Sequence, residues 1–304
     1  MYIPYTALQL VFFFLVYCFI GWIIESSWVS FHTHKLTNRG FMRGPFIPIY
    51  GFGAMTLLIV GTPLTKWPVA VFFAGMIAAS ILEYFTGVAM EAIFKVRYWD
   101  YSDKPLNING HICLFTSLCW GFLALAENYF VHKPIEKLSN FLTLKELKLI
   151  TYAVSIYFIV DLTLAFKAAL DLRDIIVKME EAKDELRIMK KRLDVILAYV
   201  DASKDEFIEE SFERADDIAD AIEERFKQLK KAMEEAPEKF ASNIAEEFNG
   251  MKEKFIEKKA TGFGFMGFKD FYKRGIFLGN PTLNSKKFKG TIETIKSYVN
   301  EKRK

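Results

Sequence analysis

The sequence predicts an all-α, polytopic membrane protein with about five transmembrane helices and a cytoplasmic helical, coiled-coil extension. Residues 1–170 are mainly apolar, whereas residues 171–304 hold 28 acidic and 28 basic residues and are therefore highly charged but neutral overall. From residue 172 to 200, apolar residues recur at the alternating spacing of three and four that is typical of a coiled-coil seam. We expect a transmembrane domain at 1–170, a cytoplasmic helical coiled-coil region at 171–257 and a basic aromatic tail at 258–304.

Each predicted span contains about 20 mostly apolar residues, the length that a helix needs to cross the hydrocarbon core. The spans lie at about 5–29, 46–64, 68–92, 112–131 and 149–170. The second is the weakest, because prolines and glycines interrupt it, and it is expected to form a broken or closely packed helix. The N-terminus lacks a basic region and a cleavage site, so we interpret it as a retained helix and not as a signal peptide.

Lysine and arginine residues in the short loops predict the orientation of the chain. The first and third loops hold three basic residues each, which favours a cytoplasmic position, while the second loop holds only Lys66. The fourth loop holds four lysines and favours the opposite orientation. We place the N-terminus outside and the C-terminus in the cytoplasm, because the alternative requires translocation of the long charged half.

Acidic residues interrupt the most apolar stretches, and charge inside a bilayer marks a candidate functional site. Glu25 lies in the first predicted span, while Glu83 and Glu91 share one face of the third, with Gly87 between them. The predicted topology places all three carboxylates near the two basic loops. We therefore predict one polar cluster, which either fixes helix packing or forms a ligand or ion path. Its members are Glu25, Arg39, Arg43, Glu83, Glu91, Arg97, Asp100, Asn109 and His111.

Two further acidic residues are secondary candidates. Glu127 lies in the outer part of the fourth predicted span and Asp161 near the middle of the fifth, where each either contacts a neighbouring helix or belongs to a polar path. The sequence predicts no catalytic residues, no bound cofactor and no metal site. Its three cysteines lie in or beside apolar stretches without C-x-x-C spacing, and His32 with His34 is the only close histidine pair. Whether the chain has an enzyme activity is left open.

Five motifs, in order along the chain, resemble a known family. They are FIGWIIES at 19–26, NRGFMRGPFIPIYGFGA at 38–54, LEYFTG at 82–87, RYWDYSDKPLNINGHICL at 97–114 and SLCWG at 117–121. Over about residues 8–131 the chain resembles the bacterial membrane proteins described as putative ABC-transporter type IV, also called CmpB-like. The resemblance implies a permease-like component of a bacterial cell (inner) membrane. Because the sequence has no G-x-x-x-x-G-K-[ST] phosphate loop, a separate ATPase subunit is the candidate partner.

The charged half is expected to be helical throughout. The seam at 172–200 packs either within the chain, as a hairpin or small bundle, or between chains as a homo-oligomer. A capping-box pattern at Ser203 predicts a second helix, and Pro237 predicts the start of a third. Residues 258–304 combine aromatics with 12 basic and 3 acidic residues, which favours a flexible tail, a tail folded on the acidic helices, or attachment to anionic lipid.

Two functions remain open at this point. The first is a permease-like transport component whose substrate the sequence does not specify. The second is a non-transporting scaffold or regulator that oligomerises or recruits a partner through its coiled coil. The lipid bilayer is the expected environment in both cases, and nucleic acid is not expected as a partner because no binding motif is present.

Overall fold

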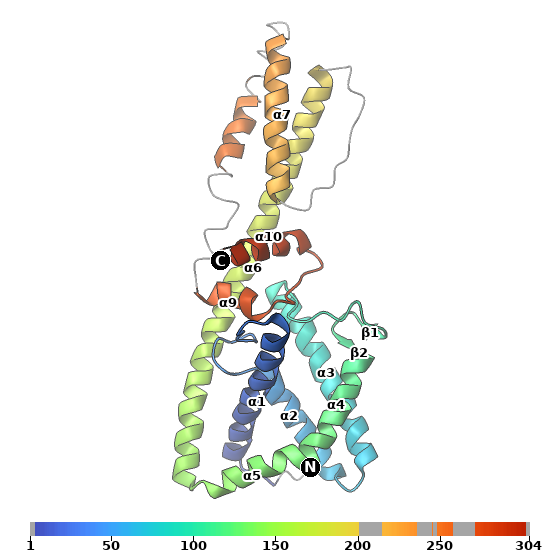
Figure 1. Cartoon of the computed structure of the whole chain (residues 1–304), viewed down its shortest axis with the longest axis vertical. Coiled ribbons are helices and arrows are strands. Elements are labelled where there is room, and N and C mark those ends of the chain that lie inside the picture. The colour runs from blue at the N-terminus through green and yellow to red at the C-terminus, as the bar shows by residue number, and fades with distance from the viewer. Residues whose placement is uncertain (1–3, 201–214, 236–244, 246–247, 258–270, 302–304) are drawn as a thin grey trace. The chain divides into compact units, whose positions relative to one another are not determined.

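The computed structural model describes residues 4–200, 215–235, 245, 248–257 and 271–301, and most of these residues are helical (Figure 1). The all-α class predicted from the sequence is therefore confirmed. Two short strands, β1 (Asn107–Ile108) and β2 (Ile112–Cys113), form an antiparallel pair.

The chain divides into two compact units. The first unit consists of Met1–Leu170 together with Phe271–Asn284, and the second consists of Asp171–Asp270 together with Ser285–Lys304. The fourteen residues Phe271–Asn284 thus return from the C-terminal region to the first unit, and we call them the return segment.

The first three helices of the first unit begin with recognisable local signals. α1 (Ala7–Thr33) begins at a capping box in which Thr6 and Gln9 exchange side-chain to backbone hydrogen bonds of 3.3 and 3.0 Å. α2 (Pro48–Gly61) and α3 (Pro68–Phe94) each begin with a proline, whose missing N–H costs nothing at the first helical position.

The rest of the first unit is a helical run that changes direction. Its elements are α4 (Leu114–Ala126), the π-helical turn η2 (Glu127–Val131), α5 (His132–Phe141) and the first part of α6 (Leu144–Val200), followed in the return segment by α9 (Phe271–Gly279). α6 is one continuous helix of 57 residues, so the predicted fifth span and the predicted coiled-coil segment belong to the same helix.

Within the residues that the structure describes, four helical segments are long and apolar enough to cross a membrane. They are Ala7–Thr33, Pro68–Phe94, Leu114–Phe141 and Leu144–Leu197. The predicted second span corresponds to a shorter apolar helix, Pro48–Leu64, formed by α2 and the 3₁₀ turn η1 (Thr62–Leu64).

Glycine allows α2 to pack closely on its neighbours. A Cβ atom at Gly51 would lie 2.7 Å from Phe14 Cε2 and would also collide with the Cys18 sulfur of α1. A Cβ atom at Gly53 would lie 2.8 Å from the Trp120 ring of α4. Small residues of this kind let helix backbones approach each other where lipid provides no hydrophobic drive for association. The glycines that weaken the second predicted span therefore serve its packing.

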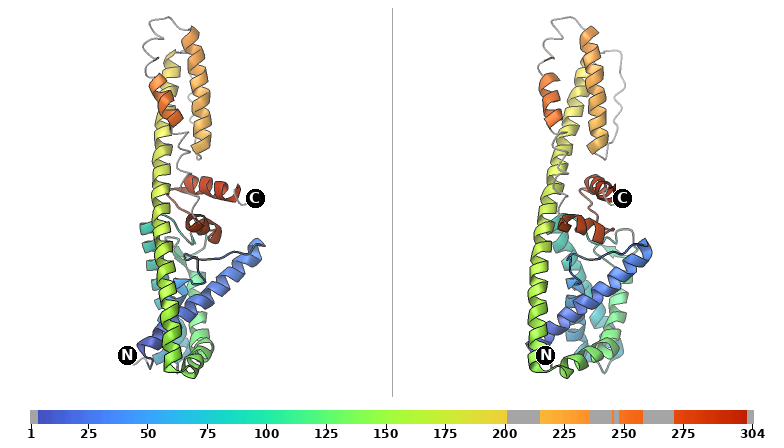
Figure 2. Two further views of the ribbon diagram at one scale, coloured as in Figure 1. Left: turned by 90° about the vertical axis from the view of Figure 1, so that its left-hand side faces the viewer. Right: turned by 60° about the vertical axis from the view of Figure 1, so that its left-hand side comes forward.

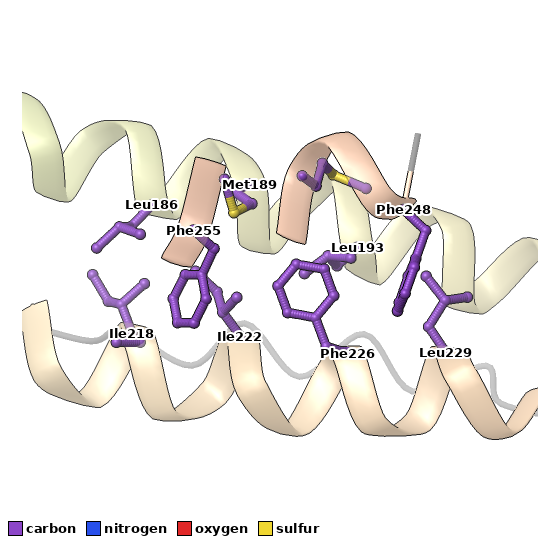
Figure 3. Packing of buried hydrophobic residues seen from close by; sticks show 11 residues of the cluster. Leu186, Met189, Leu193, Ile218, Ile222, Phe226, Leu229, Phe248 and Phe255 are labelled. Carbon is purple, nitrogen blue, oxygen red and sulfur yellow. The ribbon is translucent and has the colours of Figure 1, made fainter. Parts of the chain in front are cut away.

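The second unit has an apolar core of its own (Figure 3). One side of α6 faces α7 (Ala215–Glu235) and the helical residues 248–257, and the two views of Figure 2 show α7 running alongside the end of α6. The core residues are Leu186, Met189, Leu193, Ile218, Ala219, Ile222, Phe226, Leu229, Phe248, Met251 and Phe255.

Part of the predicted seam is thus covered within the chain, because Leu186, Met189 and Leu193 are buried in this core. The predicted capping box at Ser203 and the predicted helix start at Pro237 lie outside the described residues. A further helix of this unit, α10 (Lys289–Glu301), lies in the region predicted as a basic tail and buries Ile292 and Ile295.

Candidate functional site

Two loops and the return segment meet at one end of the first unit (Figure 1). We call this the arginine end: it comprises the loop 34–47, the loop 95–113 and the return segment. Arg97 and Asn284 form a backbone bridge with nitrogen-to-oxygen distances of 2.7 and 3.0 Å, and the Thr282 hydroxyl donates to the Tyr98 carbonyl at 3.2 Å. The C-terminal part of the chain therefore completes a surface that begins near residue 34.

The first charged group at this end joins α1 to the return segment. Nε of Arg39 lies 3.6 Å from Oε2 of Glu25, and Oε1 of Glu25 accepts a hydrogen bond of 2.8 Å from the Tyr50 hydroxyl. Nη1 of Arg39 donates to Oδ1 of Asn280 at 2.9 Å and to the carbonyl of Gly279 at 3.3 Å. Arg39 is thus held by a carboxylate on one side and by the end of α9 on the other.

Arg43 packs against α9. Its Nη2 donates to the Gly40 carbonyl at 3.3 Å, and a Cβ atom at Gly279 would lie 3.1 Å from the same nitrogen. A Cβ atom at Gly275 would overlap the guanidinium. The two glycines of α9 therefore leave the space that the Arg43 side chain occupies.

The second charged group joins α3 to the loop 95–113. Arg97 pairs through Nη2 with Glu91 at 2.7 Å and through Nη1 with Asp100 at 3.2 Å, and it also donates to the Asn109 carbonyl at 3.0 Å. Nε2 of His111 lies 3.3 Å from the same Glu91 oxygen. The side chain of Arg97 is only 6% exposed, so this is a buried network whose charges depend on one another.

The network shifts the pKa values of its loop members. The hydrogen bond to Glu91 raises the pKa of Arg97, although burial acts in the opposite direction. Burial by itself would raise the pKa of Asp100, but hydrogen bonds from the Ser102 hydroxyl and N–H, together with the Arg97 charge, hold that pKa below its usual value. Arg97 and Asp100 are therefore both charged at neutral pH.

A tight turn between β1 and β2 orients the second group. Asn109 and Gly110 both have positive φ, of 54° and 77°, and the Asn109 side chain donates to the Tyr84 hydroxyl at 3.1 Å. Asparagine and glycine tolerate this left-handed backbone better than other residues. The turn directs the Asn109 carbonyl towards Arg97, and the Trp99 indole N–H binds the His111 carbonyl at 3.0 Å.

Glu83 forms contacts of a different kind. It is buried and accepts hydrogen bonds from the Trp120 indole at 3.0 Å and from the Tyr101 hydroxyl at 3.4 Å. It precedes Glu91 by eight residues, which is about 12 Å along a helix, so it lies deeper in the bundle than the arginine loops. The structure thus brings Glu25 and Glu91 to arginines and places Glu83 among aromatic donors.

The two secondary candidates lie at different places in the first unit. Oδ2 of Asp161 accepts a 2.8 Å hydrogen bond from the Gly44 backbone, which fastens α6 to the loop 34–47. Glu127 is buried at the first residue of the π-helical turn η2. Near the start of α5, His132 bridges the hydroxyls of Tyr17 and Tyr5 at 2.9 and 3.0 Å.

A cavity of about 320 Å³ adjoins the Glu25–Arg39 group. It lies among α1, α2, α3 and α6 and is lined mainly by apolar side chains, including Phe94 and Phe166. Glu25, Arg39 and Asn280 supply its charged and amide groups. Sequence reasoning did not identify Asn280, because nothing in the local pattern around residue 280 relates it to a loop 240 residues earlier.

The residues that the structure describes contain no group of three or more histidine, cysteine, aspartate or glutamate side chains placed to hold a metal ion. The arginine end offers ion pairs and hydrogen bonds beside an apolar cavity.

A family model described as putative ABC-transporter type IV matches residues 12–166. The chain belongs to this family. No curated protein and no solved structure matches this chain. The resemblance inferred from the five motifs is confirmed, and the ABC-transporter type IV match extends beyond them into α6. The matched region covers the loops 34–47 and 95–113 but neither the return segment nor the core of the second unit. The match fits a transporter-like membrane protein.

Proposed function

We propose that this chain is the permease-like membrane component of a transport system and that its arginine end handles the transported ligand or ion. The buried network of Glu91, Arg97 and Asp100 is the observation that carries the proposal. Glu91 lies in α3, which is long and apolar enough to cross a membrane, and ionisable residues in such helices are typical of substrate and ion paths. The family description points in the same direction.

The proposal includes an orientation and a partner. The arginine end lies on the cytoplasmic side of a bacterial inner membrane in a multi-pass arrangement, because the first and third loops are rich in lysine and arginine. The chain has no phosphate-binding loop, so a separate ATPase subunit supplies the energy from the same side.

Affinity purification of the full chain from native membranes tests this assignment. We expect a nucleotide-binding subunit in fixed stoichiometry, identified by mass spectrometry, and ATP hydrolysis by the purified complex. Glu83→Gln should reduce ATP hydrolysis without dissociating the complex. Its amide oxygen can still accept from the Trp120 indole and its amide nitrogen can donate to the Tyr101 hydroxyl oxygen, while the titratable carboxyl is lost. A variant that loses the complex or its own fold instead would indicate a purely structural role for Glu83.

The second candidate is a scaffold or regulator, and it is favoured by the separate apolar core of the second unit. The same purification distinguishes it. A homo-oligomer without an ATPase, or a non-ATPase partner that is lost when the second unit is removed, contradicts the transport assignment. The deletion must replace Asp171–Asp270 by a flexible linker and end after Asn284, because the return segment belongs to the first unit.

A further inference from the structure

The cavity beside Glu25 has the form of a site for an amphiphilic molecule. Its walls come from aromatic and aliphatic side chains of α3, α6 and the two arginine loops, among them Phe41, Phe94 and Phe166. These rings are in mutual contact, with centroid separations of 5.0 to 6.4 Å. The charged pair and Asn280 supply polar groups to the same cavity. Its volume of about 320 Å³ lies at the lower end of small-molecule sites, about 300–1,000 Å³.

The contacts of Arg39 show which kind of head group is favoured. Its guanidinium already donates to Asn280, to the Gly279 carbonyl and, at 3.4 Å, to the Thr282 hydroxyl. Oε2 of Glu25 lies 3.6 Å from the Arg39 nitrogen, which is beyond ordinary hydrogen-bond distance. A carboxylate oxygen in this position can still accept a hydrogen bond from a ligand. The Glu25 side chain is 32% exposed and lines the cavity.

The charge balance decides the class of ligand. Glu25 and Arg39 neutralise each other, so an ammonium or carboxylate head would add an uncompensated charge to an apolar cavity, at a large desolvation cost. A hydroxyl donates a hydrogen bond to Glu25 without adding charge. We infer that the cavity binds an uncharged single-chain amphiphile, with its hydroxyl head at Glu25 and its apolar chain against Phe94 and Phe166. Probe binding needs this chain alone, so the inference stands whether or not an ATPase partner exists.

Photolabelling of the full chain in lipid nanodiscs tests the inference. The probes are three C12 molecules, each with a diazirine in the chain and with a hydroxyl, primary amine or carboxylate head. Cross-linked peptides are quantified by mass spectrometry as the ratio of labelling at cavity residues such as Phe94 and Trp99 to labelling at Phe73. Phe73 is 51% exposed and serves as the internal reference for partition into lipid. We expect the ratio to be about tenfold higher for the alcohol than for the other two probes, and excess unlabelled dodecanol should lower it.

Two variants sharpen the test. Glu25→Gln leaves the Arg39 charge unbalanced, so the preference should change from the alcohol to the carboxylate probe. Thr86→Phe introduces a ring into the cavity lining and should abolish cavity labelling by every probe, whereas Ile77→Phe, at a 55% exposed position of the same helix, should leave it unchanged. Hydrogen exchange identifies any variant that has lost the fold of the first unit.

Three results would overturn the inference. Equal ratios for all three head groups would refute the assigned selectivity. If excess dodecanol did not reduce the labelling of cavity residues, a saturable site would be refuted. This experiment uses the native chain alone. A Glu25→Gln protein with the selectivity of the native chain would show that the charged pair does not choose the head group.

Discussion

One ion pair from each unit shows how differently the same charges can be placed. In the first unit, the side chain of Arg97 is 6% exposed and contacts two carboxylates, a backbone carbonyl and, through Glu91, a histidine. In the second unit, Lys227 pairs with Glu224 at 3.8 Å while both side chains are more than half exposed. Arg97 therefore belongs to a buried network in the first unit and Lys227 to an exposed pair in the second, although the second unit also buries Lys183 beside Glu180.

The packing of apolar residues also differs between the two units. The second unit buries leucine, isoleucine and phenylalanine side chains in one continuous cluster, as expected where water drives association (Figure 3). In the first unit, helices approach through glycines such as Gly51 and Gly53. Because apolar surface gains little by leaving lipid, close backbone contact and polar bonds have to hold such helices together.

The largest expected effect comes from breaking the buried network. Arg97→Ala leaves Glu91 and Asp100 without their shared cation and should lower the free energy of unfolding of the first unit by about 3–5 kcal/mol. The matched change Lys227→Ala in the second unit should cost about 0–1 kcal/mol. Hydrogen exchange resolved by peptide reads the stability of each unit separately. Equal losses in the two variants would contradict the contrast drawn between the units.

An intermediate effect is expected when a helix glycine is replaced by alanine in each unit. Gly51→Ala forces a methyl group against Phe14 and Cys18 and should destabilise the first unit by about 1–3 kcal/mol. Gly250→Ala meets nothing within 4 Å on a helix of the second unit and should stabilise it by about 0.5–1 kcal/mol. Thermal unfolding in detergent, together with hydrogen exchange, measures both. A neutral Gly51→Ala variant would show that α1 and α2 can separate at little cost.

The smallest expected effect concerns pH. The folded chain holds the pKa of Asp100 below its usual value, so Asp100 adds stability above its unfolded pKa of about 3.9 and loses it as the pH falls through the folded pKa. Asp100→Asn should cost about 0.5–1.5 kcal/mol at neutral pH. The difference between the melting temperatures of the two proteins, measured from about pH 6 downwards, should shrink as the pH falls through the folded pKa of Asp100. A constant difference would mean that the Asp100 charge contributes nothing.

Much of this arrangement could be predicted from the sequence, but the contacts that the return segment makes with the arginine loops could not. Hydropathy and the proline and glycine positions predicted the helices, and loop basicity drew attention to Arg39 and Arg97. The partners of Glu83 could not be predicted from charge alone. Glu83 lies deeper in the bundle than the arginines, and there it accepts hydrogen bonds from Trp120 and Tyr101. Asn280 carried no signal, since its role depends on a tertiary contact rather than on local periodicity.

The return segment also has a consequence for biosynthesis. Arg39 and Asn280 are separated by 241 residues, and ribosomes add about 5–20 residues per second. The arginine end therefore stays incomplete for about 12–48 s after its first loop has been made, whereas the core of the second unit can assemble in the meantime. During that interval Arg39 lacks the carbonyl and amide groups of the return segment, which makes it a candidate site for a chaperone or for the head groups of anionic lipids. A chain that terminates before residue 271 would remain in this condition permanently.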